Sequence, residues 1–248
     1  MRFFLFALCL VGSIPAFSQA QTEYMNQTTR DRINFTNLNV TNNATLFTIK
    51  GEPGKLIGDP YLDTTWQAGN VKFYNKVGVS LTNDSLAGVP VRLDLSTNEV
   101  EIKAGPKSVK AVKSSAVRYV DRNNLFGSVS RFVNVHEYQG EAESLTGFFE
   151  QLVNGGKLDL LQYPSVYIRK ANYNVAMNTG TKDDEYMKKL DWYVARDKKA
   201  VKFSPGKKTI LELMDDKKEQ IEAFLKTQKP DLKSRSGLTT VFAYYNKL

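Results

Sequence analysis

The segment VPVRLDLSTNEVEIK, residues 89–103, carries the clearest signal of the fold. Two short runs of β-type residues, Val89–Leu95 and Glu99–Lys103, flank the turn-type residues Ser96–Asn98. Such a pattern is typical of two strands joined by a tight turn. This stretch therefore predicts an antiparallel strand pair.

Similar short runs occur on both sides of this stretch. Asp191–Ala195 and Ala200–Phe203 flank Arg196–Lys199 and predict a hairpin. The other runs are Gly69–Tyr74, Val77–Leu81, Val109–Val112, Ala116–Val120, Arg131–Tyr138, Lys157–Leu161 and Ser165–Lys170. Closely spaced strands with polar turns, such as Asn75-Lys76, favour a meandering antiparallel body, either an open barrel or a sandwich.

Helical patterns interrupt and then end the β-type pattern. Ser144 is a good N-cap, and apolar residues follow it at helical spacing as far as Val153, before Gly155-Gly156. We therefore expect one internal helix. Ser204-Pro205 predicts a second start, with an apolar face from Ile210 to Leu225. After Pro230, Ser236 is the expected cap of a last helix. The fold class is thus α+β, with one internal helix and a C-terminal helical pair on the β body.

The N-terminus has the features of a secretory signal peptide. A short basic start, Met1-Arg2, precedes nine apolar residues, and Ser18-Gln19-Ala20 fits a cleavage site after Ala20. The apolar run is shorter than the roughly 20 residues that a spanning helix needs, which argues against an anchor. We expect a signal peptide over residues 1–20, an Asn/Thr-rich leader over 21–50 that forms one or two strands or none, a β-rich domain over 51–203 and helices over 204–248.

The composition excludes several classes of protein. With 42% hydrophobic and 24% charged residues, the chain is neither disordered, collagenous nor a multi-span membrane protein. Cleavage of 20 of the 248 residues would leave 228 residues and remove Cys9, the single cysteine. The mature chain would then have no disulfide, no thiolate–metal site and no cysteine nucleophile. We also expect no membrane span after cleavage.

Histidine- and serine-based catalysis is poorly supported. His136 is the single histidine, so sites that require two or three histidines are impossible. We expect His136 to be a partly exposed structural residue. Ser204-Pro205-Gly206-Lys207 matches the S-x-x-K pattern, and Tyr244-Tyr245-Asn246 follows, but no K-T-G strand completes the set. N-capping is the simpler role for Ser204.

Carboxylates are the remaining side chains that could act in acid–base catalysis. Glu99 and Glu101 are two residues apart and thus share one strand face, and Asp94 precedes the turn before them. Such a group could bind a divalent cation or support glycoside hydrolysis. A solvated sheet face with lysine neighbours is the expected alternative.

The positive charge is locally concentrated. The net charge is +8. Five basic residues lie within sixteen positions: Lys103, Lys107, Lys110, Lys113 and Arg118. An exported protein would meet anionic lipid head groups or acidic glycans rather than nucleic acid. The alternative is a solvated face whose lysines limit edge pairing. Together with Tyr61 and Trp66, the residues Lys107, Lys110 and Lys113 are the weak candidates for a binding surface.

Several blocks resemble one family. They are Gly58–Leu62, Trp66–Val71, Val89–Asp94, Phe148–Leu152 with Gly156-Lys157, and Tyr244–Asn246. Over residues 51–248 the chain resembles a family of uncharacterised exported β-rich proteins common in Bacteroidetes. The resemblance implies a periplasmic or envelope location, a β-rich body and a helical tail, but no catalytic residue.

These observations together predict an exported binding or structural module without catalysis, in the periplasm or outer envelope, or secreted. The expected partner is an envelope protein, a glycan or a lipid surface, and no metal or cofactor is expected. Two alternatives remain open: an enzyme that uses carboxylates on envelope glycans, and a carrier of an apolar ligand. An enzyme would need Asp94, Glu99 or Glu101 to meet another carboxylate in a cleft. A carrier would need an apolar cavity of about 300 Å³ or more.

Overall fold

The computed structural model describes residues 54–77, 83–124, 127–174 and 177–248. Residues 52–248 belong to one compact unit. The expected signal peptide (1–20) and the leader (21–50) lie outside the described residues. The predictions made for those two segments therefore stay predictions.

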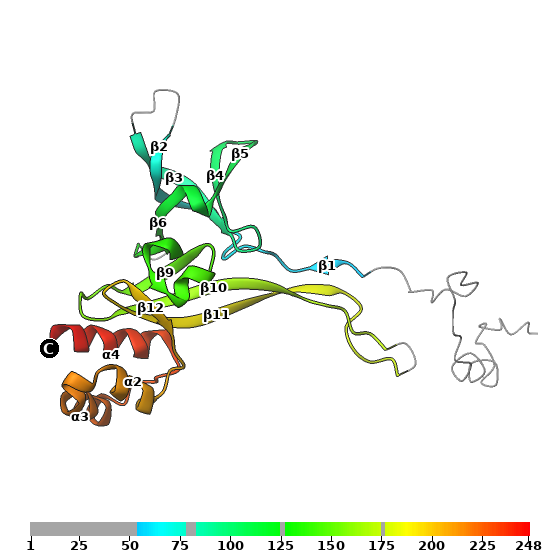
Figure 1. The fold of residues 1–248 in the computed structure, drawn as a ribbon. Helices are drawn as coiled ribbons and strands as arrows, with labels where there is room; N and C mark the ends of the chain where they lie inside the picture. Colours follow the sequence, from blue (N-terminus) through cyan, green and yellow to red (C-terminus); the bar gives the residue numbers. More distant parts are fainter. Residues whose placement is uncertain (1–53, 78–82, 125–126, 175–176) are drawn as a thin grey trace, which may run out of the picture. The chain divides into compact units, whose positions relative to one another are not determined.

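In the described residues, twelve strands form one sheet (Figure 1). The strand order is β5-β4-β3-β2-β6-β7-β9-β10-β11-β12-β8, and β1 pairs with β11 beside this path. Every pair is antiparallel except β1–β11 and β12–β8. The α+β class and the antiparallel body are confirmed, and the sheet does not close into a barrel.

The elements follow one another along the chain with short connections. The strands are β1 (Leu56–Ile57), β2 (Gln67–Val77), β3 (Asn83–Asp94), β4 (Glu99–Gly105), β5 (Ser108–Lys113), β6 (Val117–Asn123), β7 (Val129–Asn134), β8 (Gln139–Gly140), β9 (Phe148–Val153), β10 (Asp159–Arg169), β11 (Asp184–Arg196) and β12 (Lys199–Lys202). The helices are α2 (Lys207–Leu213), α3 (Lys218–Gln228) and α4 (Arg235–Lys247). Single 3-10 turns are η1 (Ser114–Ala116), η2 (Val135–Glu137), η3 (Glu141–Ser144) and η4 (Asp215–Lys217).

The expected internal helix is wrong. Its residues form η3 and strand β9, which is paired with β7 on one side and with β10 on the other. A strand buried on both faces carries apolar side chains at successive positions, so it imitates helical spacing over a short run. Phe148 and Phe149 are both buried, and they point into different clusters of the core.

The strand predictions around it are right in part. The hairpin around Arg196–Lys199 is confirmed, with Asp197 (φ 49°) and Lys198 (φ 63°) as its two turn residues. Positive φ at both positions matches the two-residue turn that suits the twist of a hairpin. The turn expected at Asn75-Lys76 is wrong, because β2 continues through it. The run expected over Arg131–Tyr138 ends at Asn134, where η2 begins.

Three clusters of buried apolar residues form the core. The first core lies on β2 to β7 with Phe148: Val71, Phe73, Val91, Leu93, Val100, Ile102, Val117, Val120, Phe132 and Phe148. The second core contains Val135, Tyr138, Ala142, Phe149, Leu161, Tyr193, Ala195 and Ala200. The third core joins β10 and β11 to the helices: Leu158, Leu160, Val194, Phe203, Ile210, Met214, Ile221, Leu225, Leu238, Val241, Phe242 and Tyr245. Leu160 and Leu161 are neighbours on β10 and enter different cores, because side chains alternate across a strand.

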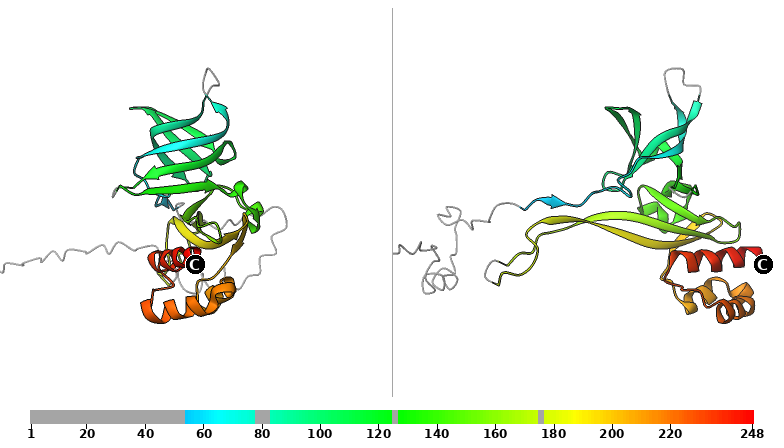
Figure 2. Two further views of the ribbon diagram at one scale, coloured as in Figure 1. Left: turned by 90° about the vertical axis from the view of Figure 1, so that its left-hand side faces the viewer. Right: turned by 180° about the vertical axis from the view of Figure 1, so that it is seen from behind.

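The C-terminal helices pack on the β10–β11 part of the sheet, as both views show (Figure 2). The expected pair is present, but its first member is divided at Met214 into α2 and α3. The two expected caps are also displaced. Gly206 stands at the N-cap of α2 in place of Ser204, and Ser234 caps α4 in place of Ser236 by accepting a hydrogen bond from the Gly237 amide. Among the described residues, no helix combines the length and apolar character needed to cross a bilayer.

Replacement of Phe149 by alanine tests the importance of β9. Phe149 is fully buried, and its ring lies 5.0 to 5.7 Å from the rings of Tyr138, Tyr163 and Tyr193. We expect Phe149→Ala to lower the free energy of unfolding by about 3–5 kcal/mol in urea titrations, because it leaves a cavity. Val129→Ala, at a side chain that is 61% exposed, is the control and should change it by less than about 0.5 kcal/mol. Equal effects of the two variants would contradict this account of β9.

Candidate functional site

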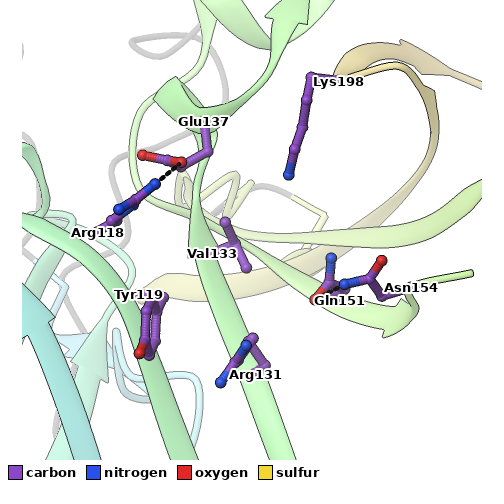
Figure 3. A pocket seen from close by; sticks show the side chains of 8 residues that line it. All are labelled: Arg118, Tyr119, Arg131, Val133, Glu137, Gln151, Asn154 and Lys198. Carbon is purple, nitrogen blue, oxygen red and sulfur yellow. Dashed lines mark hydrogen bonds and ion pairs between the residues drawn. The ribbon is translucent and has the colours of Figure 1, made fainter. Parts of the chain in front are cut away.

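A small polar pocket of about 180 Å³ lies where β6, β7 and β9 meet η2 and the β11–β12 turn (Figure 3). Its lining consists of Arg118, Tyr119, Arg131, Val133, Glu137, Gln151, Asn154 and Lys198. The sheet register explains part of this grouping, since Tyr119 is the cross-strand partner of Val133 and Arg131 that of Gln151. Three cations and one carboxylate are thus gathered around one hollow.

Arg131 is held rigidly at one side of the pocket. Its Nε and one Nη donate to the two carboxylate oxygens of Asp121, both at 2.7 Å, from the neighbouring strand. Its guanidinium carbon lies 4.6 Å from the centre of the Tyr119 ring. The hydrogen bonds that Arg131 donates to Asp121 raise the pKa of Arg131. This fork-to-fork pairing fixes the plane of the guanidinium, which is the arrangement that arginine uses to recognise planar anions.

Arg118 stands at the opposite side and pairs with Glu137 of η2. The Nη2–Oε2 distance is 3.3 Å, and the Arg118 side chain remains 53% exposed. Glu137 also accepts a hydrogen bond from the Tyr74 hydroxyl, and burial and this bond raise the pKa of Tyr74 to about 12. Glu137 is therefore shared between two donors. Arg118 donates to it through one nitrogen, so its other N–H groups can donate to a further group.

Lys198 is the third cation and differs from the two arginines. It is the second residue of the β11–β12 turn, and its backbone adopts the left-handed conformation that non-glycine residues adopt at a cost. Its Nζ lies 4.9 Å from the centre of the Tyr138 ring. Within the described part of the chain, no carboxylate forms an ion pair with it. Lys198 thus brings to the pocket an ammonium group that has no ion pair among the described residues, although its charge counteracts the rise in the pKa of Asp159 that burial causes.

Two side-chain amides complete the lining. Gln151 Nε2 donates to the Tyr138 hydroxyl at 3.3 Å, and Asn154 Nδ2 makes a long contact of 3.5 Å with Gln151 Oε1. With these amides, the pocket offers hydrogen-bond donors from five residue types: arginine, lysine, tyrosine, glutamine and asparagine. Among the lining residues, the one carboxylate is engaged by Arg118 and Tyr74, and no serine, cysteine or histidine lies beside it. The arrangement suits the binding of an anion rather than acid–base or nucleophilic chemistry.

The predicted residues Tyr61 and Trp66 come together elsewhere, around Arg92. The guanidinium carbon of Arg92 lies 3.6 Å from the centre of the Tyr61 ring and 4.5 Å from that of Trp66. Arg92 also donates to Glu101 Oε2 from Nε at 3.0 Å and from Nη2 at 2.5 Å. These aromatic side chains hold the segment before β2 against β3 and β4. Their faces are occupied by a residue of the chain itself.

The three predicted carboxylates share one sheet face but have separate partners. Asp94 and Glu99 are cross-strand neighbours, and Glu101 pairs with Arg92. Asp94 Oδ1 accepts hydrogen bonds from Ser96 N, Ser96 Oγ and Thr97 N, so it closes the β3–β4 turn. Within the part of the chain that the structure describes, no group of three or more metal-ligating side chains is found.

The predicted lysine strip does not form a single face. Lys113 lies across from Glu99, whereas Lys110 lies across from Ile102, whose side chain is in the first core. Lys107 is in the turn between β4 and β5, and Arg118 lines the pocket. Because β5 is at the end of the sheet order, these lysines border its open edge, a placement that limits pairing with other chains.

His136 and Asn246, which belongs to the pattern that follows Ser204, form hydrogen bonds within the fold. His136 is exposed in η2, and its amide donates to Asn134 Oδ1 at 2.9 Å. The later Tyr244-Tyr245-Asn246 lies in α4, where Asn246 Oδ1 accepts from Leu158 N at 3.0 Å and Nδ2 donates to Leu158 O at 2.8 Å. These bonds fasten α4 to the start of β10.

Sequence reasoning had identified Arg118 as a cation but missed Arg131, Gln151, Asn154 and Lys198. Residues 118 to 198 span six strands, β6 to β11, and no local pattern links them. Among these four residues, only Lys198 had a signal in the sequence, because it lies in the segment Arg196–Lys199 that is predicted to be a hairpin turn. Comparison of the chain with protein-family models, with curated proteins and with solved structures found no match.

The partly buried pair of Arg92 and Glu101 supports a test with a matched control. Their side chains are 18% and 16% exposed. We expect Glu101→Gln to lower the free energy of unfolding by about 2 kcal/mol in urea titrations, because Arg92 loses its charged acceptor. Glu99→Gln, two residues away on the same face, should change it by less than about 0.5 kcal/mol. A loss as large for Glu99→Gln would show that the pair is not what stabilises this face.

The raised pKa of Tyr74 predicts a dependence of stability on alkaline pH. The value rises from 10.0 to about 12 in the folded chain, mainly through burial and then through Glu137. The folded state therefore retains the proton longer, and this contribution to stability is lost as the pH rises from 10 towards 12. As the pH rises over this range, the melting temperature of Tyr74→Phe, measured by circular dichroism, should fall less steeply than that of the unmodified protein. Tyr167→Phe, at an exposed tyrosine outside the pocket, should follow the unmodified protein.

Proposed function

We propose that this protein is an exported, envelope-associated binding module without catalysis. We further propose that its pocket binds an oxyanion group, a carboxylate or a phosphate, carried by an envelope molecule. The observation that carries the proposal is the placement of Lys198, an unpaired ammonium group in a strained turn, beside Arg118 and Arg131 in one pocket. The signal-like residues 1–20 support export.

The pocket's charge is the main argument for an anion. Among its eight lining residues, Glu137 alone is acidic, against three cations. Arg118 pairs with Glu137 and Arg131 with Asp121, so the excess positive charge is that of Lys198. Hydrogen bonds between a cation and an oxyanion are short and about twice as strong as neutral ones. A volume of about 180 Å³ fits a single small anionic group rather than a drug-sized ligand, which needs roughly 300 Å³ or more. The rest of the bound molecule would then lie outside.

The two other classes considered have less support. A glycan-cleaving enzyme needs two carboxylates across a cleft, whereas Asp94 and Glu101 are each committed to bonds within the chain. Glu99 lies on the sheet between its cross-strand partners Asp94 and Lys113. A carrier of an apolar ligand needs an enclosed apolar cavity of about 300 Å³ or more, whereas this pocket measures about 180 Å³. A second hollow, of about 470 Å³ beside α2, has one apolar residue, Leu211, among five charged ones: Lys207, Lys208, Glu212, Asp215 and Lys218.

Binding of two simple probes tests the proposal. We would titrate the chain, purified after export, with inorganic phosphate and with acetate at constant ionic strength, and follow the backbone amide shifts by NMR. Lys198→Met should weaken binding of either probe by about tenfold, which corresponds to one charge-assisted contact of about 1.4 kcal/mol. Lys199→Met, the adjacent lysine outside the pocket, should bind as the unmodified chain does.

The same experiment can contradict the proposal. Shifts spread over the surface, with equal weakening by both variants, would indicate unspecific attraction to a basic protein. Vesicles of anionic phosphatidylglycerol, compared with neutral phosphatidylcholine, then test whether a lipid head group supplies the anion. Loss of vesicle binding in Lys198→Met alone would identify that source.

A further inference from the structure

Strands β10 and β11 continue as a two-stranded ribbon beyond their other neighbours, as both ribbon views show (Figures 1 and 2). On β10, Gln162 is the last residue that pairs with β9. On β11, the pairing with β12 begins only at Tyr193. Between these points, residues 163–169 pair with residues 185–191 alone, apart from the two-residue strand β1 on β11. A two-stranded ribbon is by itself marginally stable in water.

Exposed apolar side chains are concentrated on this ribbon and its loop. Six of the ten large hydrophobic residues exposed in the described part of the chain belong to it or to β1: Leu56, Ile57, Tyr167, Ile168, Met177 and Leu190. Tyr167 is 53% exposed, and Ile168 is 40% exposed. Exposed apolar groups that gather on one part of a protein often mark a contact with another molecule.

Both outer edges of the ribbon are open over most of their length among the described residues. β1 pairs only with the first two residues of β11, and β10 has no strand on its outer side from Tyr163 to Arg169. The open stretch of β11 carries the charged residues Lys188 and Lys189. Natural sheets block such edges with proline or charge. On β10, Pro164 and Arg169 stand at the two ends of the free edge. The residues between them, Ser165–Ile168, include no proline and no charged side chain.

The charges of the ribbon are neutralised within the chain. Arg169 pairs with Glu185, Lys170 with Asp184, and Lys189 with Asp191. Lys188 pairs with Asp59 at 3.0 Å. The ribbon is thus locally balanced in a chain whose net charge is +8, so two copies can approach here with little repulsion.

We infer that the free edge of β10 pairs antiparallel with β10 of a second copy of this chain, with Tyr167 on the two-fold axis. In this register Val166 faces Ile168 of the second copy, and Ser165 faces its Arg169. Aromatic and β-branched cross-strand pairs are favourable, and no like charges stand directly opposite each other. A two-fold contact uses the same surface on both copies, which is the commonest form of self-association.

The oligomeric state tests this inference. We expect the chain, purified after export, to sediment as a dimer at micromolar concentration. Tyr167→Lys would place two ammonium groups opposite each other at the axis, so the apparent mass should fall about twofold. Val129→Lys, a charge at a more exposed apolar residue away from the ribbon, should leave the dimer unchanged. Circular dichroism confirms that both variants are folded.

A crosslink tests the register. Directly opposed residues of antiparallel strands have Cα atoms about 4.5–5.5 Å apart, which a disulfide can bridge. Tyr167→Cys should therefore form a covalent dimer under mild oxidation, and Val129→Cys should not. A monomeric unmodified chain, or a dimer that persists in Tyr167→Lys, would overturn the inference. Neither result bears on anion binding, because the pocket lies on other residues.

Discussion

The whole sheet depends on the hydrogen-bonded ladders of β9. This strand joins β7 to β10, and it is the link between the strands from β5 to β7 and those from β10 to β8. Its side chains enter all three cores: Phe148 the first, Phe149 the second, and Leu152 with Val153 the edge of the third. A residue with helical conformation here would leave the amide and carbonyl groups of two neighbouring strands without partners.

β9 also fixes the helices and the pocket. Glu150 is almost buried and accepts two hydrogen bonds, at 2.7 and 2.5 Å, from Arg235 at the start of α4. Removal of Arg235 would leave the Glu150 charge in a poorly solvated place, which is far more costly than the net value of the pair, whereas Arg235 itself is half exposed. One residue further along, Gln151 points to the other face and lines the pocket beside Arg131. The alternation of one strand thus connects core, helix and binding site.

The pocket and the ribbon make opposite use of charge. In the pocket, cations from separate strands are placed together and Lys198 has no ion pair among the described residues, which is the basis of the proposed anion binding. On the ribbon, each ionic pair is closed within the chain, so apolar groups and backbone edges are what remains for contact. The first arrangement favours a small anion and the second a neutral surface, such as the same strand of another copy.

The sequence by itself determined the local elements that depend on short-range patterns. The β3–β4 pair, the hairpin at Arg196–Lys199 and the amphipathic C-terminal helices follow from turn residues and periodicity. Only the tertiary structure decided that residues 148–153 are a strand, because a short apolar run fits either period and its two flanking strands settle the choice. Only the tertiary structure brought Arg118, Arg131 and Lys198 together, and separated Lys110 from Lys113. Register across strands sets these neighbours, and it arises from pairings between distant parts of the chain that no local window contains.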